Sequence, residues 1–324
     1  MSDFRPPDSL ITKVSHRSMA TDFVVMLPSH WSGHVEAVLE ALESLDAIES
    51  RLTIYRDDSE IAQVNRSAAD QPVQLSQPTF DLLQRAIEWS RRTNGAFDVT
   101  AGPLVEAWGF TQRSGRKPSA EQIDQARHLV GYEGLQLTQA DRTVRFTRPG
   151  MSINLGAIGK GDALDRLAAD LRGQGIEDFL IHGGNSSVIA VGNQNPSVDS
   201  GWPIGIAHPT KSERRLGGVW LKDTALATSG SGKQFFHHRG KRYGHVIDPR
   251  TGYPAGDLLA LTVLMPSAAD ADACATGMFV MGSEEIDSPA NQAWVPPRVA
   301  VKQGPRQDEA EWTTAGDVDW IEEA

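Results

Sequence analysis

Two short segments in the C-terminal half of the chain carry residue types that together can perform phosphoryl chemistry. In the segment 245–252 (HVIDPRTG), the imidazole of His245 and the carboxylate of Asp248 are three residues apart, beside a turn favoured by proline and glycine. Farther along, Asp272 and Thr276 are four residues apart, so on a helix their oxygens share one face. A carboxylate beside a hydroxyl suits Mg²⁺ that holds a substrate phosphate, and a histidine suits proton transfer.

Each of these residues also has an ordinary structural interpretation. A histidine beside a turn commonly hydrogen-bonds to a carbonyl, and an aspartate before proline commonly caps the turn. Asp272 and Thr276 could instead form a solvated helix face. Only the combination of the two segments indicates phosphoryl chemistry.

Two glycine-rich segments could bind the phosphate of such a substrate. Residues 156–161 (GAIGKG) precede an expected helix, so their N–H groups and the helix dipole could face an anion. This segment matches neither a P-loop nor a dinucleotide fingerprint, and its alternative is a tight turn with a surface lysine, Lys160. Residues 228–235 (TSGSGKQF) could line a polar ligand or form a flexible hairpin tip.

The spacing of apolar residues predicts the elements that must position these segments. Helical spacing predicts helices over 34–51, 77–93, 160–173 and around 271–281. Short apolar runs predict strands at 24–27, within 52–60, and at 144–146, 152–155, 179–182 and 187–192. This mixture of helices and strands indicates an α+β fold, and the sequence contains no internal repeat.

Length and composition limit the class of protein. The 324 residues suffice for about two average domains or for one large domain with two lobes. A net charge of −11 argues against broad binding to nucleic acid or to an anionic membrane. The single cysteine, Cys274, excludes an internal disulfide, and no Cys/His spacing indicates zinc.

The N-terminal residues 1–12 are expected to form a flexible arm. They lack the apolar segment of a secretory signal, and no window of the chain approaches the roughly 18 apolar residues of a membrane helix. We therefore expect a cytoplasmic protein without a membrane partner.

Taken together, these segments resemble the ApbE family of flavin transferases. The resemblance keeps the family's order along the chain from Met19 to about Gly282. It rests on the segments already described, at 156–161, 228–235, 245–252 and 272–276. It also rests on residues 19–23, 55–60, 97–104, 108–110 and 183–184. Each piece is common by itself, whereas the ordered set is specific to the family.

The resemblance implies an α+β fold of two lobes, related to the T-fold, with flavin bound in the cleft between them. Residues 13–324 would form one domain whose two lobes are intertwined. The implied reaction splits FAD at its pyrophosphate, attaches FMN to a threonine or serine hydroxyl of an acceptor protein through a phosphoester bond, and releases AMP. The implied cofactor is Mg²⁺, and the implied partners are FAD and the acceptor protein.

Residue roles also follow from the resemblance. Asp272, Thr276 and the backbone carbonyl of Ala157 would hold the metal, while His245 and Asp248 would be the catalytic residues. The residues expected to contact FAD are Met19, Tyr55, Phe97, Asp98, Thr100, Gly102, Lys160, Gly183, Gly184, Ser229 and Gly230.

Three positions depart from the family pattern. Asn154 and Asn185 stand where aspartate is usual, and Gly159 stands where alanine is usual. Two alternatives to the transferase therefore stay open. One is an FAD pyrophosphatase that releases free FMN, and the other is a flavin-binding or flavin-delivery protein without catalysis.

Overall fold

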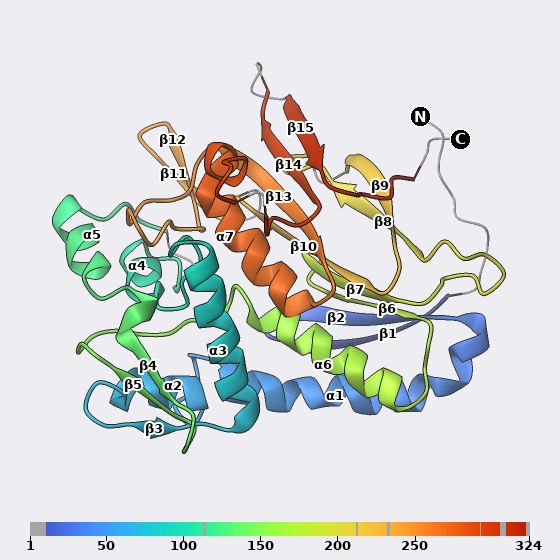
Figure 1. The fold of residues 1–324 in the computed structure, drawn as a ribbon, viewed down its shortest axis with the longest axis horizontal. Coiled ribbons are helices and arrows are strands. Elements are labelled where there is room, and N and C mark those ends of the chain that lie inside the picture. Colours follow the sequence, from blue (N-terminus) through green and yellow to red (C-terminus); the bar gives the residue numbers. More distant parts are fainter. Residues whose placement is uncertain are drawn as a thin grey trace.

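An antiparallel sheet of eight strands forms the centre of the computed structural model (Figure 1), which describes residues 11–112, 115–211, 213–231, 234–291, 293–304 and 309–321. Neighbouring strands in it follow the order β1-β2-β6-β7-β10-β13-β14-β15. Their bounds are Ile11–Ser18, Thr21–Pro28, Phe179–Gly183, Ser187–Val191, Thr224–Gly230, Leu258–Met265, Arg298–Gln303 and Ala310–Ala315.

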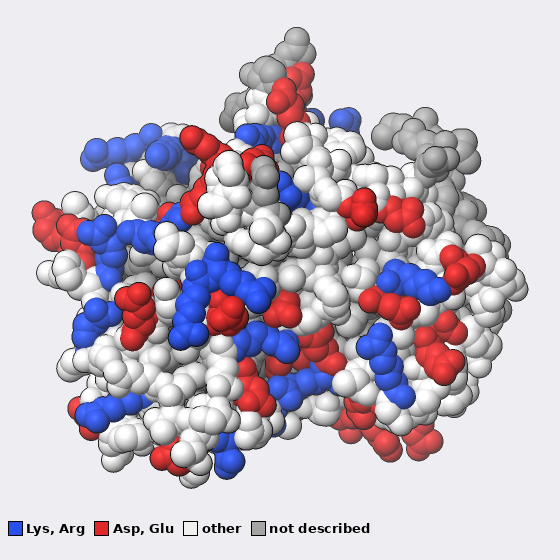
Figure 2. All heavy atoms as spheres, in the orientation of Figure 1, with Lys and Arg blue, Asp and Glu red and all other residues white. Residues whose placement is uncertain are grey.

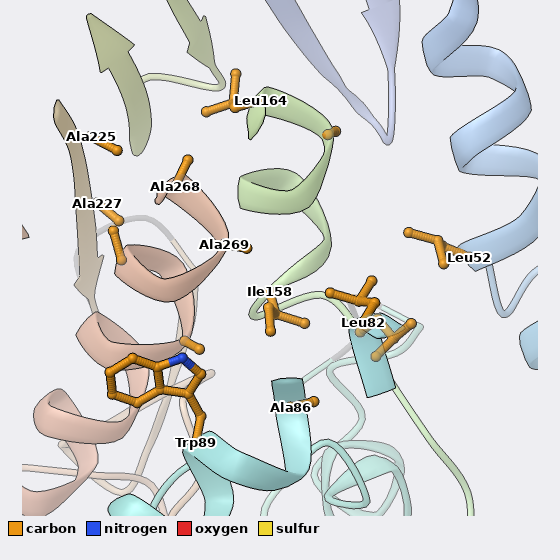
Figure 3. Packing of buried hydrophobic residues seen from close by; sticks show 14 of the residues in the cluster. Leu52, Leu82, Ala86, Trp89, Ile158, Leu164, Ala225, Ala227, Ala268 and Ala269 are labelled. Carbon is orange, nitrogen blue, oxygen red and sulfur yellow. The ribbon is translucent and has the colours of Figure 1, made fainter. Parts of the chain in front are cut away.

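Three long helices cover one face of this sheet: α1 (Val35–Leu52), α6 (Gly159–Gly173) and α7 (Ala268–Ile286) (Figure 1). Helix α6 packs on β6 and β7, and α7 packs on β10 and β13. Figure 3 shows Ala225 and Ala227 of β10 beside α7, with Trp89 nearby. Such small side chains let the helix approach the sheet closely, and most of α7 is buried.

The opposite face of the sheet is covered by a second antiparallel pair, β8 (Trp202–Ala207) and β9 (Arg215–Leu221). Its apolar side chains join a separate core cluster with residues of the central sheet, which includes Leu180, Val188 and Leu226. Both faces are therefore buried at the centre of the sheet, where β6 and β7 read as nearly continuous apolar runs, whereas the edge strands β1 and β15 are more exposed.

A second group of elements lies beside the helical face (Figure 1). It contains α2 (Glu60–Ser67), α3 (Gln77–Arg92), α4 (Gly102–Ala107), α5 (Ala120–Arg127) and the sheet β3-β5-β4 (Val73–Gln74, Thr143–Phe146, Leu135–Thr138). Two 3-10 turns, Ser29–His34 and Tyr132–Gly134, complete the connections. The hairpin β11–β12 (Phe235–His238, Lys241–Gly244) packs with α4 and α5 around Trp108 and Tyr243.

The α+β class and the four long helices expected from apolar spacing are confirmed, with ends shifted by a few residues. The region 52–60 contains a turn and the start of α2 instead of a strand. The expected strand at 152–155 is also absent, because Ile153 donates to and accepts from the side chain of Asn65 (2.7 and 3.0 Å) and pairs with no strand there. Strand β1 already begins at Ile11, inside the expected arm, and residues 1–10 lie outside the described part of the chain.

Charged groups of both signs are interspersed on the face shown in Figure 2. Within the described ranges, no helix combines the length and the apolar character that crossing a membrane requires.

Candidate functional site

Asp272, on helix α7, joins that helix to the first turn of α6. The residue is only 6% exposed, and Oδ2 accepts hydrogen bonds from the Gly161 amide (3.1 Å) and from the Lys160 ammonium (3.2 Å). Oδ1 accepts from the hydroxyl of Ser187 at 2.8 Å. The carboxylate is thus stabilised by a helix N-terminus, a cation and a hydroxyl, which together offset its burial.

Thr276 and Ser229 extend this cluster of oxygens by one helical turn. Thr276 Oγ1 donates to the carbonyl of Asp272 at 3.0 Å, and Ser229 Oγ lies 2.8 Å from Thr276 Oγ1. Because Thr276 donates its only hydroxyl proton to a carbonyl, Ser229 must be the donor between the two hydroxyls. One lone pair of Thr276 then remains for a ligand, on the same helix face as the carboxylate of Asp272.

The candidate metal ligands agree with the chemistry of Mg²⁺. A carboxylate, a hydroxyl and the carbonyl of Ala157 are hard oxygen donors, and Mg²⁺ usually takes one or two carboxylates together with water and substrate phosphates. No group of three His, Cys, Asp or Glu side chains suited to a metal occurs in the part of the chain that the structure describes. A metal here would therefore depend on this mixed set of oxygens.

His245 follows β12 directly, and its ring is held by one carbonyl. Both its backbone N–H and its Nδ1 lie 3.1 Å from the carbonyl oxygen of Gln234. A carbonyl only accepts, so Nδ1 carries the proton and Nε2 is left as an acceptor. Burial, followed by the charge of Lys160, lowers the pKa of His245, although its bond to Gln234 opposes this. The ring is therefore neutral at pH 7 and able to accept a proton.

Asp248 is paired with an arginine that lies two residues farther along the chain. Arg250 binds both of its carboxylate oxygens (Nε to Oδ1 3.0 Å, Nη2 to Oδ2 3.2 Å) and also bonds to Glu285 through Nη1, at 2.9 Å to each oxygen. The Asp248 backbone exchanges hydrogen bonds with the turn at Gly252 and Tyr253. An aspartate occupied in this way is better suited to holding the turn after His245 than to accepting a proton.

The segment expected to contact flavin, 97–102, is bonded mainly to its own surroundings. Asp98 accepts from the amide and hydroxyl of Thr100 (2.8 and 2.7 Å) and from the amide of Tyr132 (2.8 Å). Thr100 is fully buried, and Phe97 is 2% exposed. Burial raises the pKa of Asp98, while these hydrogen bonds oppose that effect. These residues, with Gly102 packed against Ser152, shape the local backbone.

Met19 and Tyr55 offer more accessible surface. Met19 and Ala20 form the two-residue turn between β1 and β2 with φ of 51° and 60°, a conformation that non-glycine residues seldom adopt. The amide of Met19 donates to Glu49 at 2.7 Å, which holds this turn against α1. Tyr55 is 74% exposed, so its ring is available for stacking.

The remaining glycines expected to contact FAD lie at the ends of two strands, β6 and β10. Gly183 ends β6 against the ring of Phe23, and Gly184 adopts φ +61° in the turn to β7. Gly230 ends β10, where a side chain would meet the carbonyl of Leu259. Around Asp272, hydrogen bonds directly join four of the expected site residues: Lys160, Ser229, Asp272 and Thr276. Among the described residues, no hydrogen bond or ion pair joins Tyr55 to this cluster.

The residue missed from sequence was Ser187, which is fully buried at the start of β7 and bonded to Asp272. A hydroxyl opening an otherwise apolar strand after two glycines was its only signal. Asn154 departs from the family pattern, but its Oδ1 accepts the Gly156 amide at 2.9 Å, a hydrogen bond that aspartate would also make. Asn185 is exposed and has φ 59°, which asparagine tolerates well.

Comparison with solved structures defines the class of protein to which this fold and site belong. The structure of the flavin transferase ApbE from Vibrio cholerae matches with a TM-score of 0.80 and 28% identity, covering 94% of this chain and 97% of that one. The apo flavinyl transferase ApbE of Pseudomonas stutzeri matches with a TM-score of 0.82 and 26% identity, covering 94% of both chains. The expected fold, that of the flavin transferases, is confirmed.

Sequence comparison then identifies the family. The family model described as "ApbE family" matches residues 19–296. A protein of Vibrio cholerae named FAD:protein FMN transferase is 34% identical over 80% of this chain and 77% of its own length. One of the same name from Escherichia coli (strain K12) is 29% identical over 91% of this chain and 85% of its own length. The chain belongs to the ApbE family.

Proposed function

We propose that the chain is an Mg²⁺-dependent FAD:protein FMN transferase. Supporting observations are the family membership, the names of the relatives and, above all, the cluster at the start of α6 and α7. In this cluster the carboxylate of Asp272 lies beside Lys160, the N-terminus of α6 and the hydroxyl of Thr276. Burial, together with the charge of Lys160, lowers the pKa of His245, which favours its neutral form. This is a suitable set of groups for a pyrophosphate and for a proton acceptor.

The proposed roles divide between metal and phosphate. Asp272, Thr276 and the carbonyl of Ala157 would hold Mg²⁺, which when bound would neutralise the pyrophosphate and the charge that develops on AMP. Lys160 and the N-terminus of α6 would bind phosphate oxygens, because both are positive. Both also lie beside Asp272, the proposed metal ligand. Met19, Tyr55 and residues 97–102, 183–184 and 229–230 would surround the rest of FAD between the two lobes of a single domain, 13–324.

His245 is the proposed general base. Its Nε2 would take the proton from the hydroxyl of an acceptor threonine or serine as that oxygen attacks the phosphorus of the FMN half. The bond from this phosphorus to the bridging oxygen then breaks, and AMP leaves with the electron pair. Asp248 supports this role through the turn that follows His245, because it is paired with Arg250.

The experiment follows both products of the reaction. Purified protein is mixed with FAD, Mg²⁺ and a peptide that contains one threonine in a flavinylation-site sequence, and AMP release and peptide mass are measured. Peptide that gains the mass of FMN in step with AMP supports the proposal. AMP with free FMN and unmodified peptide would indicate the pyrophosphatase, whereas bound and intact FAD would indicate a binding or delivery protein.

The cellular setting is also part of the proposal. We place the protein and its acceptor in the cytoplasm, with no nucleic-acid or membrane partner. Cell fractionation followed by detection of the protein and of covalently flavinylated acceptor tests this; recovery of both outside the cytoplasm would contradict it.

A further inference from the structure

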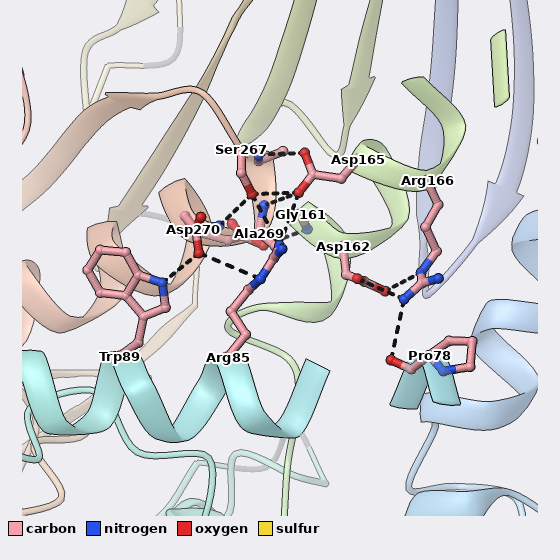
Figure 4. A network of polar contacts seen from close by, with 12 residues as sticks. Pro78, Arg85, Trp89, Gly161, Asp162, Asp165, Arg166, Ser267, Ala269 and Asp270 are labelled. Carbon is pink, nitrogen blue, oxygen red and sulfur yellow. Dashed lines mark hydrogen bonds and ion pairs between the residues drawn. The ribbon is translucent and has the colours of Figure 1, made fainter. Parts of the chain in front are cut away.

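Helices α6 and α7 begin at the same place and cap one another. Asp272, in the second turn of α7, accepts the amide of Gly161 in the first turn of α6. In return Asp165, one turn farther along α6, accepts the amides of Ala268 (2.7 Å) and Ala269 (3.0 Å) in the first turn of α7. Figure 4 shows the second half of this exchange, with Asp165 facing Ser267 and Ala269.

The two helices are also in close backbone contact at this crossing. A Cβ on Gly161 would lie 2.2 Å from the carbonyl oxygen of Ala268, so no side chain fits between the helices. The N-cap of α7, Ser267, donates its hydroxyl to Asp165 at 2.6 Å. The first turn of α7 is thus fixed to α6 by three hydrogen bonds to a single carboxylate.

Helix α3 connects to the same point from the other side. Arg85 lies 3.5 Å from Asp165 and 3.8 Å from Asp270, and it donates to Ser267 at 3.3 Å (Figure 4). Trp89, one turn along α3, donates its indole N–H to Asp270 at 2.7 Å. Burial raises the pKa of Asp165, and the donors around it oppose this. The carboxylate of Asp165 therefore connects the first turn of α7 both to α6 and, through Arg85, to α3.

We propose that Asp165 is a positioning residue for the metal site. Two of the proposed ligands, Asp272 and Thr276, lie on α7, and the third, the carbonyl of Ala157, precedes α6. By fixing the first turn of α7 to α6, Asp165 sets the separation of these ligands without touching metal or flavin. The inference rests on the proposed function, because it assumes that these three groups hold the metal.

The structure also indicates which property should change. Asp165 bonds only to the start of α7 and to Arg85, and within the described residues it forms no hydrogen bond or ion pair with the flavin candidates at Tyr55 or 97–102. Mg²⁺ demands nearly ideal octahedral geometry, so small displacements of its ligands weaken binding. Loss of Asp165 should therefore reduce metal affinity while leaving affinity for FAD in metal-free buffer unchanged.

The test compares Asp165→Asn with Asp162→Asn, a matched control on the same helix. Asp162 is also largely buried, but its carboxylate binds Arg166 (2.7 and 3.1 Å), and within the described residues it forms no hydrogen bond or ion pair with α7. Mn²⁺ binding is measured by electron paramagnetic resonance with saturating FAD, and FAD binding is measured by flavin fluorescence in EDTA. We expect about tenfold weaker Mn²⁺ binding for Asp165→Asn, a change within about twofold for Asp162→Asn, and unchanged FAD binding for both.

A second readout separates positioning from general damage. With excess Mg²⁺, the rate of AMP release by Asp165→Asn should recover, whereas damage to the fold would lower it at every concentration. If Asp165→Asn does not fold, Ser267→Ala removes one of the three hydrogen bonds, and Mn²⁺ binding weaker than that of the unaltered protein is then expected. Unchanged Mn²⁺ affinity, or an equal loss in Asp162→Asn, would overturn the inference. Absence of FMN transfer by the unaltered protein would contradict the proposed function alone, because the comparison of Mn²⁺ binding does not depend on turnover.

Discussion

The ammonium group of Lys160 lies 3.2 Å from Oδ2 of Asp272, and its charge adds to burial in lowering the pKa of His245. One side chain therefore acts on the candidate metal ligand and on the candidate base. Lys160 stabilises the buried carboxylate electrostatically and disfavours a second positive charge on the imidazole. A change at Lys160 should therefore alter both the proposed metal site and the pKa of His245. Only the change in pKa should shift the pH dependence of the rate.

Replacing Lys160 with methionine should raise the pKa of His245, although burial, the larger cause of the lowered value, remains. A base must be neutral to act, so activity is lost as pH falls through its pKa. The acidic limb of the rate of AMP release should lie below about pH 6.5 in the unaltered protein and move upward in Lys160→Met. A limb that moves downward would contradict the assignment. Lys160→Arg, which keeps the charge, is the control and should leave the limb in place.

Replacing His245 with glutamine should lower kcat by about 10²- to 10⁴-fold, because a general base typically contributes that much. The acidic limb should disappear as well, since the titrating group is gone. His237→Gln is the matched control, because His237 is an exposed histidine on the adjoining hairpin. The rates are measured across the pH range for both variants. A similar loss in both, or an unchanged limb in His245→Gln, would exclude His245 as the base.

Replacing Gly161 with alanine should destabilise the fold. The new methyl would lie 2.2 Å from a backbone oxygen of α7, and neither backbone can move without disturbing the capping between the helices. Overpacking of this kind costs about 1–3 kcal/mol of the free energy of unfolding. A methyl on Gly173, at the other end of α6, would meet no other part of the chain within 4 Å, so Gly173→Ala should be neutral or stabilising by up to about 1 kcal/mol. Urea unfolding of both variants tests this, and equal stabilities would contradict the close crossing.

The thiol of Cys274 should not react with iodoacetamide in the folded protein. The side chain is fully buried between Asp272 and Thr276 on α7, where it contacts Met278, and burial raises its pKa well above that of a free thiol. Alkylation requires an exposed thiolate. Mass spectrometry should detect labelling only after denaturation. Rapid labelling of the native protein at the rate of a free thiol would show that α7 opens readily.

Local patterns predicted the long helices well but not the contacts that join distant segments. The spacing of apolar residues located α1 and α3, and the four-residue spacing of Asp272 and Thr276 correctly predicted a shared helix face. Sequence alone could not reveal that Ser187 would meet Asp272, because the two are 85 residues apart. The prediction of a strand at 152–155 was wrong for the same reason. Ile153 bonds to the side chain of Asn65, which lies 88 residues earlier and could not be identified as its partner from sequence. The pairing of Asp248 with Arg250, only two residues away, could have been foreseen.

The position of α7 late in the chain has a consequence for protein synthesis. Gly161 and Asp272 are 111 residues apart, and strand β13, which lies between β10 and β14, immediately precedes α7. A nascent chain that has emerged only as far as β10 possesses the glycine-rich turn but neither Asp272 nor Thr276. Its central sheet is also incomplete on one side. Partly synthesised molecules on the ribosome therefore lack the groups proposed to consume FAD, and this capacity arises only after Asp272 and Thr276 have been added to the chain.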